Sequence, residues 1–269
     1  MRIKDTLGGG LSWIWLTVVL LVIWEIVARL VHSLFVPPIS RIFTTFVQEW
    51  LSPDPRTLFT SDLFRENVFP SLERFAGGYL AAAIAGIAMG IVMGVWWPAG
   101  AFFRPLVRFG MSVPATALIT IAIAIFGIAS SMNVFLIAVG SVWPILLNTY
   151  DGVRSIDRTV LLAARSLHLT RWRLFRSVWL PGASPSIVAG LRVSLGIALV
   201  LMVASELYAA TDGIGYTLVV HQRTFKMAEV WSDTFLVALI GIIANAIFSA
   251  IERRALRWRT AARGSAEFA

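Results

Sequence analysis

The chain has 269 residues, of which 58% are hydrophobic and 14% are charged, and its mean hydropathy is +0.78. This composition excludes an ordinary soluble domain, because too few polar side chains are available to cover its surface. Twenty-three Lys and Arg against fifteen Asp and Glu give a formal charge of +8, which in a membrane chain is typical of cytoplasmic loops and does not predict nucleic-acid binding.

Six apolar runs are long enough to cross a bilayer, since about 20 helical residues span its hydrocarbon core. In chain order they cover 11–31, 75–96, 106–128, 132–150, 187–207 and 232–251. The first is too long for a signal-peptide core and no cleavage site follows it, so we expect a retained span. None alternates with period two, which excludes a β-barrel. The sequence predicts an all-α, polytopic membrane protein with six transmembrane helices.

The distribution of basic residues predicts the orientation, because short loops rich in Lys and Arg stay in the cytoplasm. With six spans, both termini share one side, and fifteen of the twenty-three basic residues lie there. These are Arg2, Lys4, Arg104, Arg108, Arg154, Arg158, Arg165, Arg171, Arg173, Arg176, Arg253, Arg254, Arg257, Arg259 and Arg263. We therefore expect both termini to be cytoplasmic.

No linker or clear internal repeat divides the chain, which predicts a single transmembrane domain over 1–269 with a peripheral first helix at 11–31. Residues 32–74 form an external connector that contains Pro37, Pro38, Pro53 and Pro55. Two amphipathic pieces, at 42–51 and 64–72, are expected to lie along the outer interface. The connector is either a partner-binding surface or a plain surface connection.

Small residues recur at every fourth position of the second span and predict close helix packing along one face. They are Gly78, Ala82, Gly86, Gly90 and Gly94. The partner helix is either a fixed or a moving neighbour. In the third span, Pro105 and Pro114 are expected to start or kink the helix.

Charges inside the spans are costly and therefore informative. Glu25 and Arg29 are four residues apart and are expected to pair with each other. Arg192 is expected to extend toward the interface. Glu206 has no assignable partner, which leaves a satisfied structural carboxylate or a site for a bound cation or amine as alternatives.

The cytoplasmic loop 151–186 is far longer than a connection requires, and long structured loops tend to be functional. Periodicity predicts a helix over 155–167 that turns one apolar face inward, made of Ile156, Val160, Ala163, Ala164 and Leu167. Leu162 then projects among polar residues. Thr170 is expected to cap a second helix over 171–180, which Pro181 ends. Either a partner covers this hairpin or it rests on the inner leaflet.

The residues of this loop resemble the cytoplasmic signature of permease subunits of ATP-binding-cassette importers of the taurine, alkanesulfonate and nitrate type. That signature begins with Glu-Ala-Ala, has a Gly five to six positions on and closes at Leu-Pro. The matching segments are Leu162-Ala163-Ala164-Arg165-Ser166-Leu167-His168 and Leu180-Pro181-Gly182, followed by Ala189-Gly190-Leu191-Arg192, Ala204-Ser205-Glu206 and Gly213-Ile214-Gly215-Tyr216, with Val36-Pro37-Pro38 after the first span.

The resemblance implies a type I importer permease fold in which the helix before the signature turn is the coupling helix, seated in a groove of a nucleotide-binding subunit. The implied coupling residues are Arg158, Leu162, Ala163, Ala164, Arg165, Ser166 and His168. Two positions depart from the signature, because Leu162 replaces the usual Glu and His168 the usual Gly. A heterodimer with a more typical permease, a matched change in the ATPase subunit or a non-transporting relative would each account for this.

The same resemblance implies ATPase subunits, a second permease chain in a homodimer or heterodimer, and an external solute-binding protein as partners, besides membrane lipid. It also implies a multi-pass protein of the bacterial inner membrane. The solute is expected to be small and anionic, such as a sulfonate, nitrate, bicarbonate or an aromatic carboxylate. The sequence assigns no solute-binding residues.

Catalysis is not expected in this chain. It lacks the Gly-x-x-x-x-Gly-Lys-Ser/Thr phosphate loop, so no cofactor is expected here, and ATP and Mg²⁺ would belong to a partner subunit. It has no cysteine, and three isolated histidines predict no metal site. The alternative function is an ATP-independent channel or secondary carrier, which normally needs charges or interrupted helices at mid-membrane.

Overall fold

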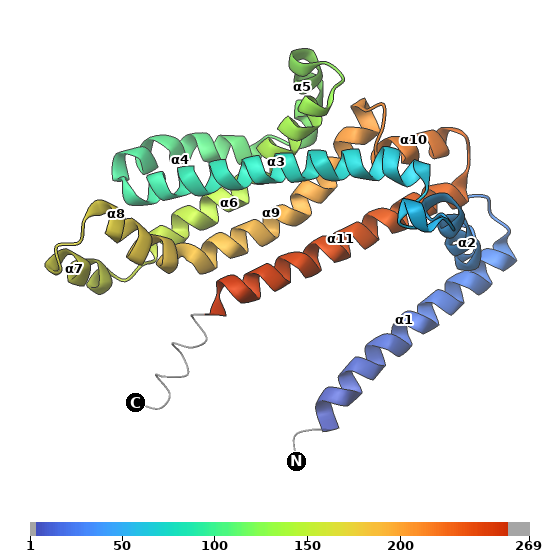
Figure 1. Cartoon of the computed structure of the whole chain (residues 1–269), viewed down its shortest axis with the longest axis horizontal. Coiled ribbons are helices and arrows are strands. Elements are labelled where there is room, and N and C mark those ends of the chain that lie inside the picture. The colour runs from blue at the N-terminus through green and yellow to red at the C-terminus, as the bar shows by residue number, and fades with distance from the viewer. Residues whose placement is uncertain (1–3, 258–269) are drawn as a thin grey trace.

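The computed structural model describes residues 4–257, with side chains from Trp15 onward except those of Arg56 and Arg165. The regular elements of this part are helices (Figure 1), apart from a single bridge between Leu51 and Thr60. The α-helices are α1 Lys4–Val31, α2 Ile39–Trp50, α3 Asp62–Val95, α4 Trp97–Ser112, α5 Leu118–Phe126, α6 Ser130–Arg154, α7 Arg158–Ser166, α8 Arg171–Leu174, α9 Leu180–Ala209, α10 Ile214–Arg223 and α11 Met227–Ala255. Arg2, Arg259 and Arg263 of the predicted cytoplasmic set lie outside the described residues.

The centre of the fold is the contact between α3 and α6, which the small residues of α3 make possible. A Cβ built on Gly78 would lie 2.6 Å from the Cβ of Ile137, and one on Gly90 would lie 2.6 Å from the Cβ of Thr149. Gly86 and Gly94 approach α6 in the same way, and Ala82 is buried. The partner number on α6 rises in step with the glycine number, so the two helices run parallel.

Helix α9 packs on α6 in the opposite direction and also contacts α3. Ser186 lies against Gly152, whereas Ser194, further along α9, donates a hydrogen bond from Oγ to the carbonyl oxygen of Ser141 at 2.6 Å. The hydroxyl of Tyr79 on α3 donates to the carbonyl oxygen of Leu191 at 2.8 Å. Three helices thus form a tight layer that α4 and α5 flank on one side and α11 on the other (Figure 1).

The predicted third span is not one helix. Helix α4 begins at Trp97, and the chain bends by 78° before continuing into α5. Pro114 is the local cause, since a proline disfavours helical geometry at the residue before it, and Val113 has an extended ψ of 118°. Pro105 lies inside α4 and does not start it. The kink expected at Pro114 is therefore confirmed, and the run 106–128 is not one straight helix.

The predicted number of six spans is not confirmed within the described residues. Within the described residues, four helices are long and apolar enough to cross a membrane: α3, α6, the continuous segment Arg171–Ala209 and α11. The bent α4–α5 pair raises this number to five if it counts as one span. Helix α1 has 28 residues but side chains described only from Trp15. It packs on α2 at one end and diverges from α11 along its length (Figure 1).

The expected connector over 32–74 is partly helical core. Ser61 caps α3 by accepting a hydrogen bond from the Phe64 backbone N–H at 3.1 Å, and α3 then runs without a break to Val95. Residues 64–72 are therefore the first turns of a long helix and not a separate interfacial piece. The other amphipathic segment is α2, which buries Ile42, Phe46 and Trp50.

Two ends of the molecule can now be distinguished. The α2/α10 end holds α2, α10 and the beginnings of α3 and α11, whereas the α7/α8 end holds the loop 151–186 (Figure 1). Arg192 on α9 pairs with Glu252 near the end of α11, so this arginine is held by a carboxylate and does not merely extend to the interface. The predicted pair of Glu25 and Arg29 is present at 2.6 Å.

We predict that Gly78→Ala destabilises the protein, whereas Gly77→Ala is nearly neutral. The new methyl group of Gly78→Ala would meet Ile137 at 2.6 Å and the Val134 carbonyl oxygen at 2.9 Å, whereas that of Gly77→Ala would meet only Val134 at 3.8 Å. Overpacking of this kind costs about 1–3 kcal/mol. Thermal unfolding of the purified variants measures the difference, and equal midpoints for both would contradict the proposed contact.

Candidate functional site

The loop at the α7/α8 end is a short helical hairpin. Asp157 precedes α7 and its Oδ1 accepts a hydrogen bond from the backbone N–H of Thr159 at 2.7 Å. Because this bond favours the ionised carboxylate, it holds the pKa of Asp157 below its usual range. Helix α7 ends at Ser166, and His168 then adopts φ = +49° in the turn. This is the left-handed region that Gly adopts most easily, so His168 carries a small conformational cost.

The predicted inward face of this segment is confirmed only in part. Ala164 is 5% exposed, and Ile156 and Leu161 line the space between the hairpin and the ends of α3 and α6. Val160 and Leu167 were expected to be covered but are 48% and 72% exposed. A nine-residue helix standing off the bundle has few neighbours, so its periodicity alone does not fix which side is covered.

The implied coupling residues differ in whether they are exposed or face the rest of the chain. Leu162 is 50% exposed and shares the outer surface of α7 with Arg158, Ala163 and Ser166, and His168 is also exposed. Ala164 faces the chain itself, and the side chain of Arg165 is outside the described residues. Together with Val160, Leu167 and Trp172, Leu162 is one of four large apolar side chains of the hairpin that nothing in the described part of the chain covers. We call Val160, Leu162, Leu167 and Trp172 the hairpin patch.

The hairpin is joined to α9 by a π-helix. Thr170 caps α8 as expected, with its hydroxyl accepting from the Arg173 backbone N–H at 3.4 Å. Residues Phe175–Trp179 then form a π-helix that leads directly into α9. Pro181 was expected to separate two helices, but helical structure continues through it from the π-helix into α9. The hairpin and α9 are therefore mechanically continuous.

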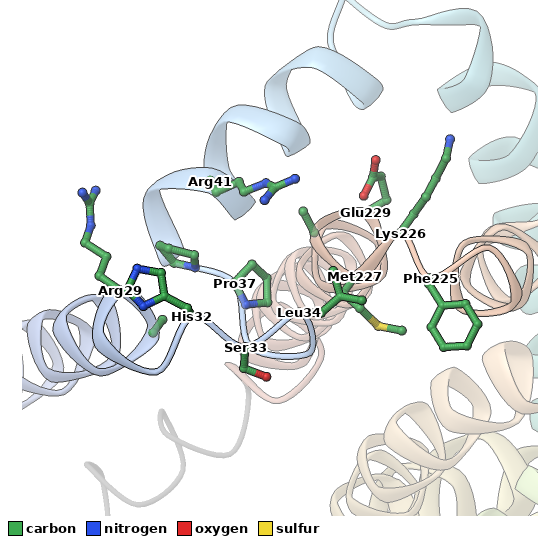
Figure 2. Close-up of a pocket in the computed structure, with 13 residues that line it drawn as sticks. Arg29, His32, Ser33, Leu34, Pro37, Arg41, Phe225, Lys226, Met227 and Glu229 are labelled. Carbon is green, nitrogen blue, oxygen red and sulfur yellow. The ribbon is translucent and has the colours of Figure 1, made fainter.

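A cavity of about 710 Å³ opens at the α2/α10 end, between the α1–α2 connection and the start of α11 (Figure 2). Its charged lining consists of Arg29, Arg41, Lys226 and Glu229, with His32 beside them. In Figure 2, the side chain of Arg41 extends across the space toward Glu229. The lining carries more positive than negative charge.

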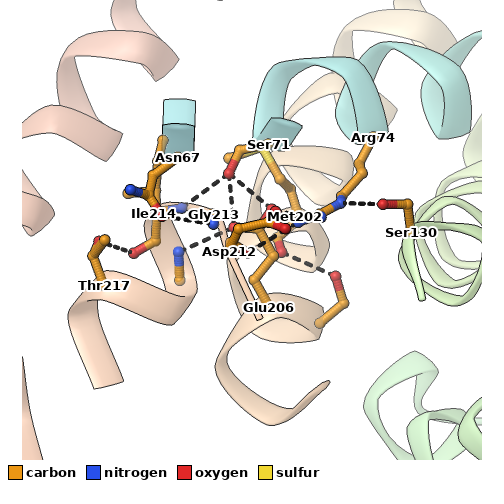
Figure 3. A network of polar contacts seen from close by, with 12 residues as sticks. Asn67, Ser71, Arg74, Ser130, Met202, Glu206, Asp212, Gly213, Ile214 and Thr217 are labelled. Atoms are coloured by element: carbon orange, nitrogen blue, oxygen red, sulfur yellow. Dashed lines mark hydrogen bonds and ion pairs between the residues drawn. The ribbon is translucent and has the colours of Figure 1, made fainter. Parts of the chain in front are cut away.

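A buried polar network lies at the same end, where α3, α6, α9 and α10 meet (Figure 3). The Arg74 guanidinium lies 3.0 Å from Glu206 Oε1 and also donates to the Asp212 carbonyl oxygen at 3.1 Å and to Ser130 Oγ at 3.0 Å. The side chains of Arg74 and Glu206 are 7% and 0% exposed. This arrangement gives Glu206 a structural partner, which the sequence did not supply.

The network also explains why Glu206 and the Gly213-Ile214-Gly215 segment occur together in the sequence. The Glu206 carboxylate accepts from the Gly215 backbone N–H at 3.0 Å, and Ser71 lies 2.8 Å from both of its oxygens. Gly213 has φ = +114°, and a Cβ there would lie 2.5 Å from the Glu206 carboxyl carbon. Only glycine fits that position, so Glu206 and the Gly213-Ile214-Gly215 turn form one unit.

Sequence reasoning missed Arg74, which was assigned to a charged external connector. The spacing of Arg74 from the small residues of α3 is the feature of the sequence that would have predicted its burial. Asn67, Ser71 and Arg74 continue toward the helix start on the same face as Gly78 and Ala82, and all five are buried. A polar extension of a packing face indicates that the face stays buried and that its polar groups have partners.

A second buried cluster joins α2, α10 and α11. His221 Nδ1 lies 2.9 Å from Asp233 Oδ2, and His221 Nε2 lies 3.8 Å from Glu49 Oε1. The Asp233 side chain is fully buried, and Trp50 Nε1 donates to Ser232 Oγ at 3.1 Å beside it. Within the described residues, Asp233 Oδ1 and Glu49 Oε2 have no hydrogen-bond partner.

Both titratable groups of this cluster outside the spans favour their protonated forms. The hydrogen bond to Asp233 raises the pKa of His221 above its ordinary value, and Glu49 and Glu229 act in the same direction. Burial raises the pKa of Glu49, against the opposing effect of His221. Protonation of His221 beside these two carboxyl groups therefore strengthens the contact of α2 with α10 and α11.

Comparison with known proteins identifies the fold and the family. The sequence profile of the family "Binding-protein-dependent transport system inner membrane component" matches residues 82–257. The chain belongs to this family of ABC transporter permeases. An ABC transporter permease protein of Brucella abortus is 31% identical to it over 203 residues, which cover 76% of this chain and 81% of the relative.

Other relatives extend the similarity over most of this permease. The taurine transport system permease protein TauC of Escherichia coli is 29% identical over 89% of this chain and 86% of its own length. The nitrate import permease protein NrtB of Leptolyngbya laminosa is 35% identical over 68% of this chain and 66% of its own length. Among solved structures, a chain of the inward-facing MetNI methionine ABC transporter superposes with a TM-score of 0.61 at 16% identity, over 72% of this chain and 95% of that one. This agreement confirms the all-α type I permease fold.

We predict that Arg74→Gln costs about 3–5 kcal/mol, because it leaves Glu206 buried without its charge partner. The control is Arg65→Gln on the same helix, which breaks an exposed pair with Asp62 and should cost about 0–1 kcal/mol. Thermal unfolding in detergent measures both. A double-mutant cycle with Glu206→Gln should show strong coupling, and additive effects would contradict the network.

We also predict that stability falls as the pH rises above about 6.5, the ordinary pKa of histidine. A pKa raised by folding means that the folded state binds the proton more tightly, so its contribution is present at low pH and lost as pH passes the raised value. Unfolding midpoints at pH 6 to 9 test this. His221→Gln should flatten the slope and the exposed His32→Gln should keep it. An unchanged slope in His221→Gln would refute the assignment.

Proposed function

We propose that this permease pairs with a second permease chain, identical or homologous, and that two ATPase subunits bind the α7/α8 end. The family supports the proposal, since its members belong to binding-protein-dependent transport systems. Alternating access needs two halves that move about a central path. One chain with four or five spans in its described part supplies one half. ATP binding and hydrolysis then belong to the partner subunits.

The observation that carries this proposal is the hairpin patch. Its four apolar side chains are 48% to 72% exposed on a helical hairpin that projects from the bundle. Exposed large apolar side chains are costly in water, and their presence on a projecting hairpin is typical of contact with a partner. The π-helix and α9 connect it without a break to the membrane layer. Movement of an ATPase subunit against α7 would therefore be transmitted to α9.

Leu162 in place of the usual Glu fits an apolar part of the ATPase groove. Burying one leucine side chain is worth about 1.5–3 kcal/mol, whereas an exposed ion pair contributes about 0–1 kcal/mol. The apolar contact can thus replace the lost charge. His168 retains the turn geometry that the usual Gly provides, since its φ of +49° lies in the same region.

The solute of this proposal is small and anionic and reaches the α2/α10 end from an external binding protein. The named relatives are permeases of taurine and nitrate transport systems. This end would face the cell exterior, with both termini and the hairpin in the cytoplasm of a bacterial inner membrane. The concentration of arginine at the α7/α8 end supports that orientation.

The test of the proposal is Leu162→Asp, with Leu162→Ala as the milder variant. We expect the aspartate to weaken retention of the ATPase subunits and to lower solute-stimulated ATPase activity about tenfold or more, since a buried unpaired charge is strongly unfavourable. The control is Leu58→Asp, the same change at an 83% exposed leucine at the opposite end.

Co-purification and ATPase assays of the three variants separate the outcomes. If both Leu162 variants assemble and hydrolyse ATP as the unmodified protein does, α7 is not the coupling element. Full solute uptake by vesicles that contain this chain without any ATPase would instead favour an ATP-independent carrier and overturn the proposed assembly.

A further inference from the structure

The cavity at the α2/α10 end holds two cations without ion partners. Arg29 is already engaged, because it pairs with Glu25 and lies 3.2 Å from Ser40 Oγ. Arg41 and Lys226, in contrast, form no ion pair with any described residue, although both line the cavity (Figure 2). Glu229 is the sole carboxylate of the described lining. Because basic side chains outnumber this one carboxylate, the lining favours an anionic group.

Two tryptophans that do not line the cavity themselves hold the α1–α2 connection, which forms one of its walls. Trp24 on α1 and Trp231 on α11 meet edge to face with ring centroids 4.8 Å apart. Trp24 Nε1 donates to the Pro37 carbonyl oxygen at 3.2 Å, and Trp231 Nε1 donates to that of Phe35 at 3.0 Å. Tryptophan with an apolar body and a bonded N–H is typical of the headgroup level of a bilayer.

The helices that leave this cavity are apolar and uncovered. From the tryptophan pair, α1 and α11 diverge toward the other end of the molecule (Figure 1). On α1, Ile23, Ile26 and Leu30 are 51%, 52% and 73% exposed, and on α11, Ile242 and Ile247 are 66% and 56% exposed. A basic cavity at headgroup level thus continues into two apolar helix surfaces in the hydrocarbon region. A free anion would use only the first of these features.

We propose that this cavity binds the phosphate headgroup of an anionic phospholipid of the adjoining leaflet, with Arg41 and Lys226 as the phosphate ligands. The acyl chains lie along the exposed surfaces of α1 and α11. The bound lipid fills the space between the α1–α2 connection and the α10–α11 turn, and so fastens α1 to the rest of the bundle. The carboxylate of Glu229 repels the phosphate and so opposes binding. This repulsion favours a headgroup with a single negative charge over one with several.

The test measures lipid binding to the purified protein, together with any subunits that co-purify, by native mass spectrometry. The probe is phosphatidylglycerol, and phosphatidylcholine serves as the lipid without net charge. Arg41→Gln and Lys226→Gln should each weaken phosphatidylglycerol binding about fivefold, since one cation near an anionic surface contributes about 1 kcal/mol. Glu229→Gln should strengthen it. The matched control is Arg223→Gln, an exposed cation at the same end that does not line the cavity and should leave binding unchanged.

Two soluble probes distinguish the source of the anion. Inorganic phosphate and glycerophosphoglycerol carry the phosphate without acyl chains, so both should compete only weakly. Competition as strong as that of the lipid would overturn the proposal in favour of a soluble-anion site. Equal binding of phosphatidylcholine, or unchanged binding in the Arg41→Gln/Lys226→Gln double variant with an unaltered unfolding midpoint, would also overturn it.

Discussion

The close approach of α3 to α6 is the contact on which the rest of the structure depends. Small residues from Gly78 to Gly94 keep this face free of bulky side chains over about 24 Å of helix. Without a hydrophobic driving force between helices in lipid, such packing contributes much of the association energy. The same face becomes polar toward the start of α3, where Arg74 reaches Glu206. One helical surface therefore sets both the spacing of the layer and the position of its polar network.

The parallel direction of α3 and α6 has a topological consequence. The segment between them must return the chain to the α2/α10 end, and α4 with α5 does so with a 78° bend. An interrupted helix at membrane depth is tolerated where neighbouring helices or a cavity satisfy its free backbone groups. The bend near Pro114 lies beside α6 and α9, whose faces it approaches through Ala115. It is the least regular part of the described membrane region.

Opposite ends of the molecule use different chemistry to hold their parts together. At the α2/α10 end, buried charge pairs fix α2, α3, α9, α10 and α11 relative to one another. At the α7/α8 end, the hairpin has apolar side chains on its exposed surface and few contacts with the bundle. The buried polar contacts keep the helices of the α2/α10 end in fixed positions. The exposed apolar side chains at the α7/α8 end suit the proposed contact with an ATPase subunit.

The sequence by itself determined the properties that depend on neighbouring residues. Run length and hydropathy predicted helices at most of the observed positions, and the Thr170 cap followed from local backbone preferences. The turn at His168 was implied by the family resemblance. Only the tertiary structure decided which residues far apart in the chain meet. The partners Arg74 and Glu206 are 132 positions apart, so no local sequence pattern predicts their contact. The same holds for the inward face of α7 and for the contacts of His221. Such pairings depend on helix direction and packing, because a periodic face shows that a helix is covered but not by which neighbour.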